Sequence, residues 1–196
     1  MSKPLVLASS SPYRRTLLER LGIPFAVAAP GVDEAALPGE PPAAIAVRLA
    51  EAKARAVAQK RTEALVIGSD QVAELDGRPV GKPIDHADAV AQLRAASGRT
   101  VVFHTGVALV DAASGRCQSR LVDVASTFRT LSDDDIARYL ARERPYDCAG
   151  SVRSEGFGIA LFERIAADDP TALIGLPLIA VVSMLRAEGY DVLASA

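Results

Sequence analysis

Short apolar runs alternate along the chain with longer stretches that are rich in helix-forming residues. The runs that read as strands are residues 5–8, 24–29, 65–67, 100–110 and 116–129. We expect the third strand to be interrupted by the sequence Gly68-Ser69-Asp70-Gln71, and the last two strands to pair as a hairpin across a turn at 113–115. Strands that alternate with helices, together with one hairpin, predict an α/β protein with a mixed sheet.

Five stretches predict helices, and several carry clear signals at their ends. They are residues 12–21, 42–60, 86–96, 132–142 and 176–188. Ser11 suits the N-cap of the first helix, and Pro12 suits its first position, where a missing N–H costs nothing. In the fourth helix, the acidic residues 133–135 lie at the positive end of the helix dipole. Residues 76–83 read as a pair of turns, and residues 145–158 read as a loop.

The composition excludes several classes of protein. A chain of 196 residues suits one domain or two small lobes that share a core. With 22 basic and 24 acidic residues, the net charge of −2 argues against nucleic acid as a partner but leaves room for a local cationic pocket. No apolar run approaches the roughly 20 residues of a membrane span, and the apolar start is too short for a signal peptide.

The two cysteines indicate the cellular compartment. Cys117 and Cys148 match neither a metal-ligand spacing nor a disulfide framework. We therefore expect a soluble protein in a reducing, cytoplasmic setting. The sequence leaves both a monomer and a homodimer open.

Two arginines in the first turn of the first helix are an unusual choice. Arg14 and Arg15 oppose the helix dipole, although the free N–H groups of a helix start favour an anion. With the hydroxyls of Ser9, Ser10 and Ser11, they would form a cradle for phosphate. The alternative is that both arginines point to solvent, at a cost of about 0.3–1 kcal/mol each. The residue types alone leave both interpretations open.

Acidic residues follow two of the predicted strands. Asp70 comes directly after an apolar strand, where ligands tend to bind in α/β sheets, and Asp33 and Glu34 follow the second strand. If both loops face one cleft, their carboxylates could share Mg²⁺ or Mn²⁺. Lys82 lies in a glycine–proline turn, whereas Lys53, in the middle of a helix, reads as a solvated lysine. The set suggests phosphate-ester or phosphoanhydride chemistry.

Other catalytic classes find little support. His86 lies near a helix start and His104 lies inside a β run, so both read as structural. The chain has neither the GxxxxGK[ST] loop of P-loop enzymes nor a GxGxxG motif. Cys148, beside Ala149 and Gly150, reads as a small packed residue rather than a reactive thiolate.

Many short motifs together resemble one known family. They are LASSSPYRR from residue 7, VDE at 32–34, EAKA around Lys53, IGSDQV at 67–72, GKP at 81–83, TG at 105–106, then YDCAGS, SEGFG and LIGLPL. In this order they resemble the Maf family of nucleoside triphosphate pyrophosphatases, over about residues 5–192. Each motif alone would be weak, and the order makes the resemblance specific.

The resemblance implies a fold, a reaction and a set of site residues. The fold would be a mixed twisted sheet with flanking helices. It would form two lobes around a central cleft, as in Maf and ITPase-like proteins, and residues 1–196 would form one catalytic unit. The reaction would hydrolyse a small-molecule nucleotide between its α and β phosphates, with Mg²⁺ or Mn²⁺ as cofactor. Asp70 would activate water, and Glu34 would hold the metal with Asp70 as a second ligand. The phosphates would be bound by Ser9, Arg14, Lys53 and Lys82, and the role of Arg15 stays open.

Three positions distinguish branches of this family. The dTTP and UTP branch carries Arg, Thr and Gln where this sequence has Tyr13, Gln71 and Glu155. The chain therefore looks like the branch that acts on 7-methyl-GTP, which carries an aromatic residue, Gln and Glu. The aromatic residue there is often Trp, so Tyr13 is a conservative departure.

The chemistry of the base agrees with this assignment. Methylation at N7 makes the guanine ring cationic, and an aromatic face such as Tyr13 attracts a cation by about 0.5–2 kcal/mol. The Watson–Crick edge of guanine offers two adjacent donors that Glu155 can accept, and Gln71 could read the guanine carbonyl. A pyrimidine would instead place acceptors against the carboxylate, at about 1–3 kcal/mol for each unpaired group.

Two alternatives remain at this point. One is the same enzyme class acting on dTTP, UTP or other modified nucleotides. The other is a non-catalytic nucleotide-binding regulator, for example of cell division, against which the set of Asp70, Glu34, Lys53 and Lys82 argues. The expected role is clearance of modified nucleotides before they enter nucleic acid.

Overall fold

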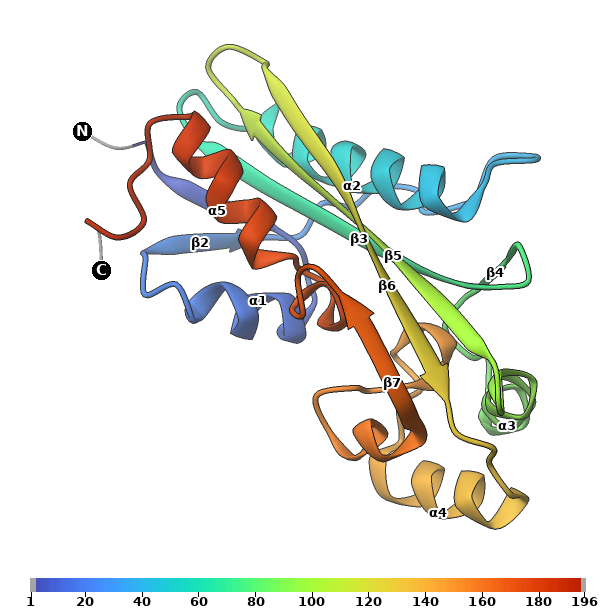
Figure 1. The fold of residues 1–196 in the computed structure, drawn as a ribbon. Coiled ribbons are helices and arrows are strands. Elements are labelled where there is room, and N and C mark those ends of the chain that lie inside the picture. The colour runs from blue at the N-terminus through green and yellow to red at the C-terminus, as the bar shows by residue number, and fades with distance from the viewer. Residues whose placement is uncertain (1–2, 195–196) are drawn as a thin grey trace.

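The structure, a computed structural model, describes residues 3–194 (Figure 1). Its strands are β1 (Leu5–Ala8), β2 (Phe25–Ala28), β3 (Leu65–Leu75), β4 (Arg78–Val80), β5 (Thr100–Asp111), β6 (Cys117–Phe128) and β7 (Phe162–Ala167). Its helices are α1 (Pro12–Glu19), α2 (Pro42–Ala58), α3 (His86–Ala96), α4 (Asp133–Glu143) and α5 (Leu178–Ala187), with 3₁₀ turns η1 (Ala149–Ser151), η2 (Phe157–Leu161) and η3 (Ala172–Ile174). The strands form one open mixed sheet in the order β2-β1-β3-β5-β6-β7, and β4 pairs with β3. The predicted α/β class with a mixed sheet is therefore confirmed.

Local signals at the helix ends act as the sequence predicts. The Ser11 side chain caps α1 by accepting a hydrogen bond from the Arg14 backbone, and Pro12 occupies the first turn. Ser132 and Asp135 form a reciprocal capping box at the start of α4. β5 and β6 pair antiparallel as the expected hairpin.

The predicted break at Gly68 to Gln71 is wrong, because β3 runs without interruption from Leu65 to Leu75. A Cβ on Gly68 would lie 2.3 Å from the Ala50 carbonyl oxygen of α2. On neighbouring β5, a Cβ on Gly106 would lie 2.2 Å from the Ala46 oxygen. These glycines therefore let α2 lie directly on the sheet, and Asp70 lies inside a strand instead of after its end. Part of the predicted turn pair at 76–83 is also ordered as β4.

Two lobes share the long central strands (Figure 1). In the first lobe, α1 and α5 pack on one face of β1, β3 and β5, and α2 packs on the other. In the second lobe, α3 and α4 pack around the distant halves of β3, β5 and β6. The separate apolar cores match the two-lobed expectation.

The edge of β3 is open between the lobes. β1 pairs with β3 only at residues 65–68, and β4 pairs with it only at residues 73–75. In the described part of the chain, residues 69–72 therefore have β5 on one side and no strand on the other. Adjacent residues of this segment point to opposite faces of the sheet, so side chains from both faces can reach the opening.

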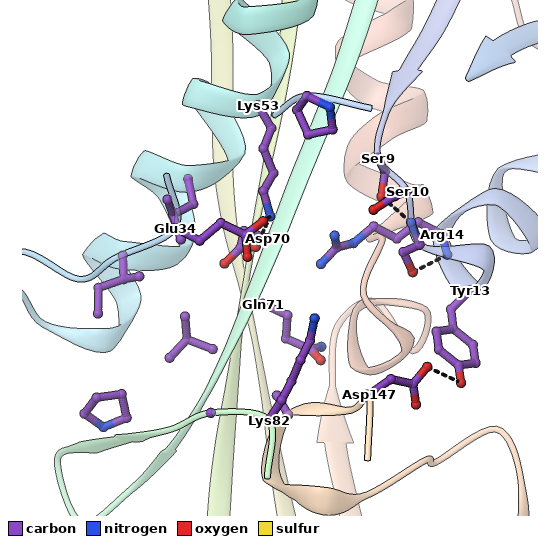
Figure 2. Close-up of a pocket in the computed structure, with 18 of the residues that line it drawn as sticks. Ser9, Ser10, Tyr13, Arg14, Glu34, Lys53, Asp70, Gln71, Lys82 and Asp147 are labelled. Carbon is purple, nitrogen blue, oxygen red and sulfur yellow. Dashed lines mark hydrogen bonds and ion pairs between the residues drawn. The ribbon is translucent and has the colours of Figure 1, made fainter. Parts of the chain in front are cut away.

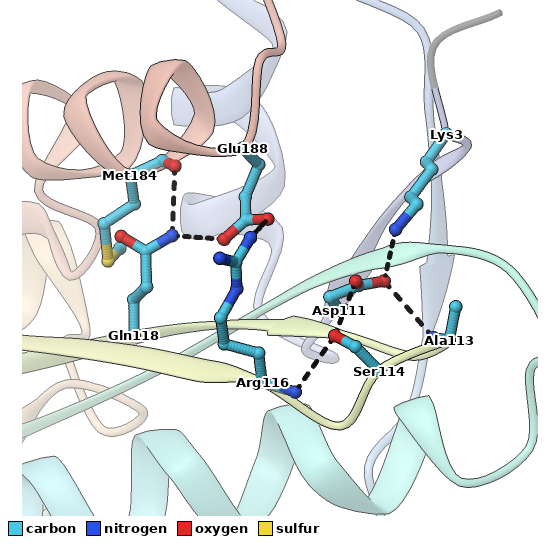
Figure 3. A network of polar contacts seen from close by, with 8 residues as sticks. All are labelled: Lys3, Asp111, Ala113, Ser114, Arg116, Gln118, Met184 and Glu188. Carbon is cyan, nitrogen blue, oxygen red and sulfur yellow. Dashed lines mark hydrogen bonds and ion pairs between the residues drawn. The ribbon is translucent and has the colours of Figure 1, made fainter.

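Polar contacts join the turn end of the β5–β6 hairpin to Lys3 and to the C-terminal end of α5 (Figure 3). Asp111 accepts hydrogen bonds from Lys3 Nζ at 2.8 Å and from Ser114 at 2.7 Å. The bond from Lys3 is the main cause that lowers the pKa of Asp111 to about 2. Beside it, Glu188 at the end of α5 accepts hydrogen bonds from Arg116 and Gln118.

None of the described helices has the length and apolar character needed to cross a membrane.

Candidate active site

Two adjoining cavities lie at the open edge of β3. The larger has a volume of about 480 Å³ and contains every residue of the predicted catalytic and phosphate-binding set, namely Ser9, Arg14, Glu34, Lys53, Asp70 and Lys82. The smaller, of about 110 Å³, is lined by Tyr13, Gln71 and Glu155. Arg14, Tyr13, Gln71 and Lys82 line both cavities, so the two predicted groups of residues meet.

A buried lysine joins two carboxylates in the larger cavity (Figure 2). Lys53 Nζ lies 2.6 Å from Asp70 Oδ1 and 2.7 Å from Glu34 Oε1, and its side chain is only 6% exposed. The interpretation of Lys53 as a solvated lysine is therefore wrong, because the face of α2 that carries it packs on β3. Within residues 3–194, Asp70 Oδ2 has no hydrogen-bond partner, so this oxygen is available to a water or a ligand.

Nearby cations keep the Glu34 side chain in its charged form. Burial alone would raise the pKa of Glu34, but Lys53, followed by Lys82 and Arg14, outweighs it. The pKa of Glu34 therefore lies below its usual range, and the carboxylate is ionised at neutral pH. The neighbouring Asp33 caps its own turn by accepting from the Ala35 backbone, so it does not share the site as the sequence had suggested.

Arg14 points its guanidinium into the cavity from the start of α1 (Figure 2). Its Nε donates to the Gly175 carbonyl oxygen at 2.8 Å, which fixes the side chain while the terminal nitrogens face the cavity. Burial lowers the pKa of Arg14, and the nearby Asp70 and Glu34 oppose the shift. Arg15 differs, since it pairs with Glu19 on the surface and its side chain is 63% exposed. The predicted cradle therefore has one arginine, and the other is solvated.

Serine hydroxyls and a second lysine add further hydrogen-bond donors to the cavity. Ser9, Ser10 and Ser11 line it where β1 ends and α1 begins. Lys82 extends into it from the loop after β4 (Figure 2). Lys82 comes from the second lobe and Arg14 from the first, so an anion bound between them would contact both lobes.

Tyr13 and Glu155 line the smaller cavity, and both have protein partners. The Tyr13 hydroxyl donates to Asp147 Oδ2 at 3.0 Å. Burial, with Cys148 and Asp147, raises the pKa of Tyr13 well above its usual range, so the phenol stays neutral. The Arg153 guanidinium lies 5.3 Å from the centre of the Tyr13 ring, and its Nε lies 3.3 Å from Glu155 Oε1.

Gln71 faces the same cavity with a fixed orientation. Its Nε2 donates to the carbonyl oxygens of Ala172 and Leu173 at 2.9 and 3.0 Å, and lies 3.0 Å from Thr105 Oγ1. The amide nitrogen is therefore occupied by the protein, and Oε1 is the group left for a ligand. This orientation corrects the expectation that Gln71 reads a carbonyl, because the free end of its amide accepts and does not donate.

The histidines and Cys148 lie as the sequence predicts, with structural contacts. His104 lies between Glu74 and Asp123, at 3.0 and 2.7 Å, and His86 lies 2.9 Å from the Tyr146 hydroxyl. Burial raises the pKa of Cys148 to about 12, so it is a thiol and not a thiolate at neutral pH.

The sequence model of the family described as Maf-like protein matches residues 4–188. The chain belongs to the Maf family. This Maf protein is 60% identical over 193 residues to the 7-methyl-GTP pyrophosphatase of Polaromonas sp., covering 98% of this chain and 88% of the relative. It is 57% identical over 194 residues to the 7-methyl-GTP pyrophosphatase of Ralstonia nicotianae, covering 99% of this chain and the whole relative. It is 56% identical over 186 residues to that of Cupriavidus metallidurans, covering 95% and 94%.

Glu34 and Asp70 are the carboxylates of this Maf protein that could bind a divalent cation in the cavity. The described part of the chain holds no group of three or more His, Cys, Asp or Glu arranged as a complete metal site. The two carboxylates come from separate elements, both contact Lys53 Nζ through one oxygen, and both line the cavity, where the other oxygen of Asp70 has no hydrogen-bond partner among residues 3–194. Mg²⁺ is usually held by one or two carboxylates, with water and substrate phosphates as the other ligands. The donor set therefore fits an ion that is shared with a phosphate.

The Maf site also contains residues whose part in it is hard to read from the sequence. Asp147 lines both cavities, and Ser69 donates to the Gly175 carbonyl oxygen at 2.9 Å. Asp147 had a signal, since it is the second residue of the YDCAGS motif, inside the predicted loop at 145–158. Gly175 lay in the LIGLPL motif, but its contact with Arg14 joins positions 161 residues apart and left no local signal.

Proposed function

We propose that this Maf protein is a nucleoside triphosphate pyrophosphatase that hydrolyses 7-methyl-GTP to 7-methyl-GMP and pyrophosphate. The observation that supports this most is that Tyr13, Gln71 and Glu155 share a cavity with Arg14, which also lines the cavity of Asp70. The names of relatives at 56–60% identity agree with it.

In the proposed reaction, Asp70 orients a water and accepts its proton through Oδ2. The water oxygen forms a bond to the α-phosphorus, and the bond from that phosphorus to the bridging oxygen breaks. The electron pair leaves with pyrophosphate, and the other product is the monophosphate. Lys53, which occupies Oδ1, holds the carboxylate in place during this step.

The leaving pyrophosphate is the group whose charge grows, and cations around it lower the barrier. Arg14 and Lys82 face the cavity from the two lobes, and Ser9 adds a hydroxyl donor. Glu34 and Asp70 would hold Mg²⁺ or Mn²⁺, which when bound supplies further neutralisation of the phosphates. These residues belong to both lobes, so we propose that the chain acts as one catalytic unit.

The base would lie in the smaller cavity. The Tyr13 ring provides an aromatic face for the cationic 7-methylguanine, and Glu155 accepts from the two donors of its Watson–Crick edge. Gln71 offers only an acceptor, so it suits the exocyclic amine better than the guanine carbonyl. Both cysteines are unpaired, which agrees with the proposal of a reducing, cytoplasmic setting.

A substrate panel tests this function. With Mg²⁺ or Mn²⁺, 7-methyl-GTP should give the highest kcat/KM among 7-methyl-GTP, GTP, dTTP and UTP, with 7-methyl-GMP and pyrophosphate identified as products. A higher value for dTTP or UTP would favour the pyrimidine branch of the family. Release of only the terminal phosphate would overturn the proposed position of cleavage.

The non-catalytic alternative is tested by removing the proposed base. Asp70→Asn should abolish turnover while nucleotide binding persists, measured by displacement of a fluorescent nucleotide. If the wild-type protein binds nucleotides without any turnover, and Asp70→Asn behaves identically, the protein is a binding module.

A further inference from the structure

Two carboxylates line the smaller cavity, and their charges are balanced differently. Glu155 lies 3.3 Å from Arg153, whose guanidinium also pairs with Glu143 at 3.0 Å. Asp147 has no ion-pair partner within residues 3–194, and its two hydrogen bonds come from the Tyr13 hydroxyl and the Cys148 thiol. Asp147 is therefore the carboxylate of this cavity that has no direct ion pair in the described part of the chain, although Arg14 and Lys82 also line the cavity.

Asp147 lies beside the ring that would receive the base. The Tyr13 hydroxyl donates to Asp147 Oδ2 at 3.0 Å, and both residues line both cavities (Figure 2). The hydrogen bond holds the tip of the ring against the carboxylate. A cationic base stacked on the Tyr13 face would then lie close to a carboxylate without an ion-pair partner among the described residues, which attracts a positive charge.

Glu155 alone does not distinguish 7-methylguanine from guanine. Guanine and 7-methylguanine present the same donors to Glu155 on their Watson–Crick edges, so this residue separates guanines from pyrimidines. The two guanines differ chiefly in the positive charge of the methylated ring. A residue that separates them must respond to that charge, and Glu155 is already balanced by Arg153.

We infer that Asp147 is the specificity-determining residue for the charge of the base: together with the Tyr13 ring, its unpaired carboxylate favours a cationic methylated purine over its neutral counterpart. This inference rests on the proposed function and divides the recognition between two side chains. Glu155 reads the edge of the purine, and Asp147 reads its charge.

The test compares kcat/KM for 7-methyl-GTP, GTP and UTP in three proteins. Asp147→Asn removes the charge but keeps an oxygen that can accept from Tyr13, and the exposed position of Asp147 makes the change compatible with folding. Glu155→Gln is the matched control, since it removes a charge from the same cavity. A thermal unfolding midpoint close to that of the wild type confirms that each variant is folded.

We expect Asp147→Asn to lower the preference for 7-methyl-GTP over GTP about tenfold, which corresponds to about 1.4 kcal/mol. Glu155→Gln should lower kcat/KM for both guanine nucleotides and leave their ratio nearly unchanged. Inhibition by 7-methyl-GMP and by GMP gives the same comparison without turnover, and the affinity ratio should fall in the same way.

Two outcomes would overturn the inference. An unchanged ratio in Asp147→Asn would mean that the carboxylate does not sense the base. An equal loss on all three triphosphates would place its role at the phosphates or at a metal ion. A wild-type protein that prefers dTTP or UTP would instead contradict the proposed function, so the two failures are distinguishable.

Discussion

At the scale of single residues, the site depends on a lysine that is buried between acids. An ammonium group removed from water is costly unless it is paired, and Lys53 is paired with both Asp70 and Glu34. Its helix context predicts a solvated side chain, because nothing local reveals which face of α2 packs on the sheet. Ser11, Pro12 and Arg14 were predictable because capping and anion binding at a helix start depend on neighbouring residues.

Replacing this lysine should disable the site. Lys53→Met is expected to lower kcat/KM for 7-methyl-GTP at least about 100-fold, because Asp70 and Glu34 would then repel each other and the triphosphate. Steady-state kinetics measures the effect, and circular dichroism shows whether the variant is folded. Activity within a few-fold of the wild type in a folded variant would contradict the central role of Lys53.

At the scale of elements, η3 and the residue that follows it, Gly175, support three side chains of the site. The carbonyl oxygens of residues 172–175 accept from Gln71 and Ser69 on β3, and from Arg14 on α1. The sequence predicts most elements correctly but places a break in β3, because glycine is a frequent breaker. The distinction between a break and a close helix crossing requires knowledge of what packs above the strand.

Gly175→Ala tests this support. Gly175 has a φ of +116°, and a Cβ there would lie 3.4 Å from Arg14 Nε. The change should cost about 1–2 kcal/mol of stability, because alanine disfavours this φ. Relief of this strain moves the Gly175 carbonyl oxygen that holds Arg14 Nε, so KM for the triphosphate should rise several-fold. Chemical denaturation and steady-state kinetics provide the two measurements.

Gly189→Ala is the matched control for this prediction. Gly189 has a φ of +75°, and a Cβ there would have no neighbour within 4 Å. It should lose a similar amount of stability without any change in KM. If both variants raise KM equally, the effect is general and the contact with Arg14 is not its cause.

At the scale of the whole molecule, two lobes are joined by long strands (Figure 1), and Lys3 and Glu188 are held at the turn end of the β5–β6 hairpin. The alternation of elements predicts the α/β class, and the resemblance to the Maf family implies the lobes. The open edge of β3 was not predictable, because it depends on where β1 stops and β4 begins in the register of the sheet. The pairing of Lys3 with Asp111 likewise joins positions 108 residues apart.

This network should make stability depend on pH. The pKa of Asp111 is lowered to about 2 in the folded protein, against about 4 for an ordinary carboxyl. The stabilisation is therefore complete above about pH 4 and is lost as the pH falls toward 2. At pH 7, Asp111→Asn should cost about 1–3 kcal/mol, and the difference from the wild type should shrink with acid.

Urea denaturation at several pH values measures this dependence. The control is Asp133→Asn, which removes a carboxylate from a solvent-exposed pair with Arg94 and should change stability much less than Asp111→Asn does. A constant difference between the wild type and Asp111→Asn down to pH 2 would contradict the role given to the charge of Asp111.

Side chains along the unpaired stretch of β3, residues 69–72, alternate between the two faces of the sheet. The site therefore depends on the exact number of residues that precede this stretch in the strand. Asp70 turns toward α2, whereas Ser69 and Gln71 turn toward residues 172–175 on the opposite face. Deleting one residue upstream in the strand would exchange these directions, so the amide would meet Lys53 and the acid would meet carbonyl oxygens. A substitution within residues 69–72 changes one side chain of the site. A deletion or insertion of one residue before them would instead send every side chain of this stretch to the opposite face of the sheet.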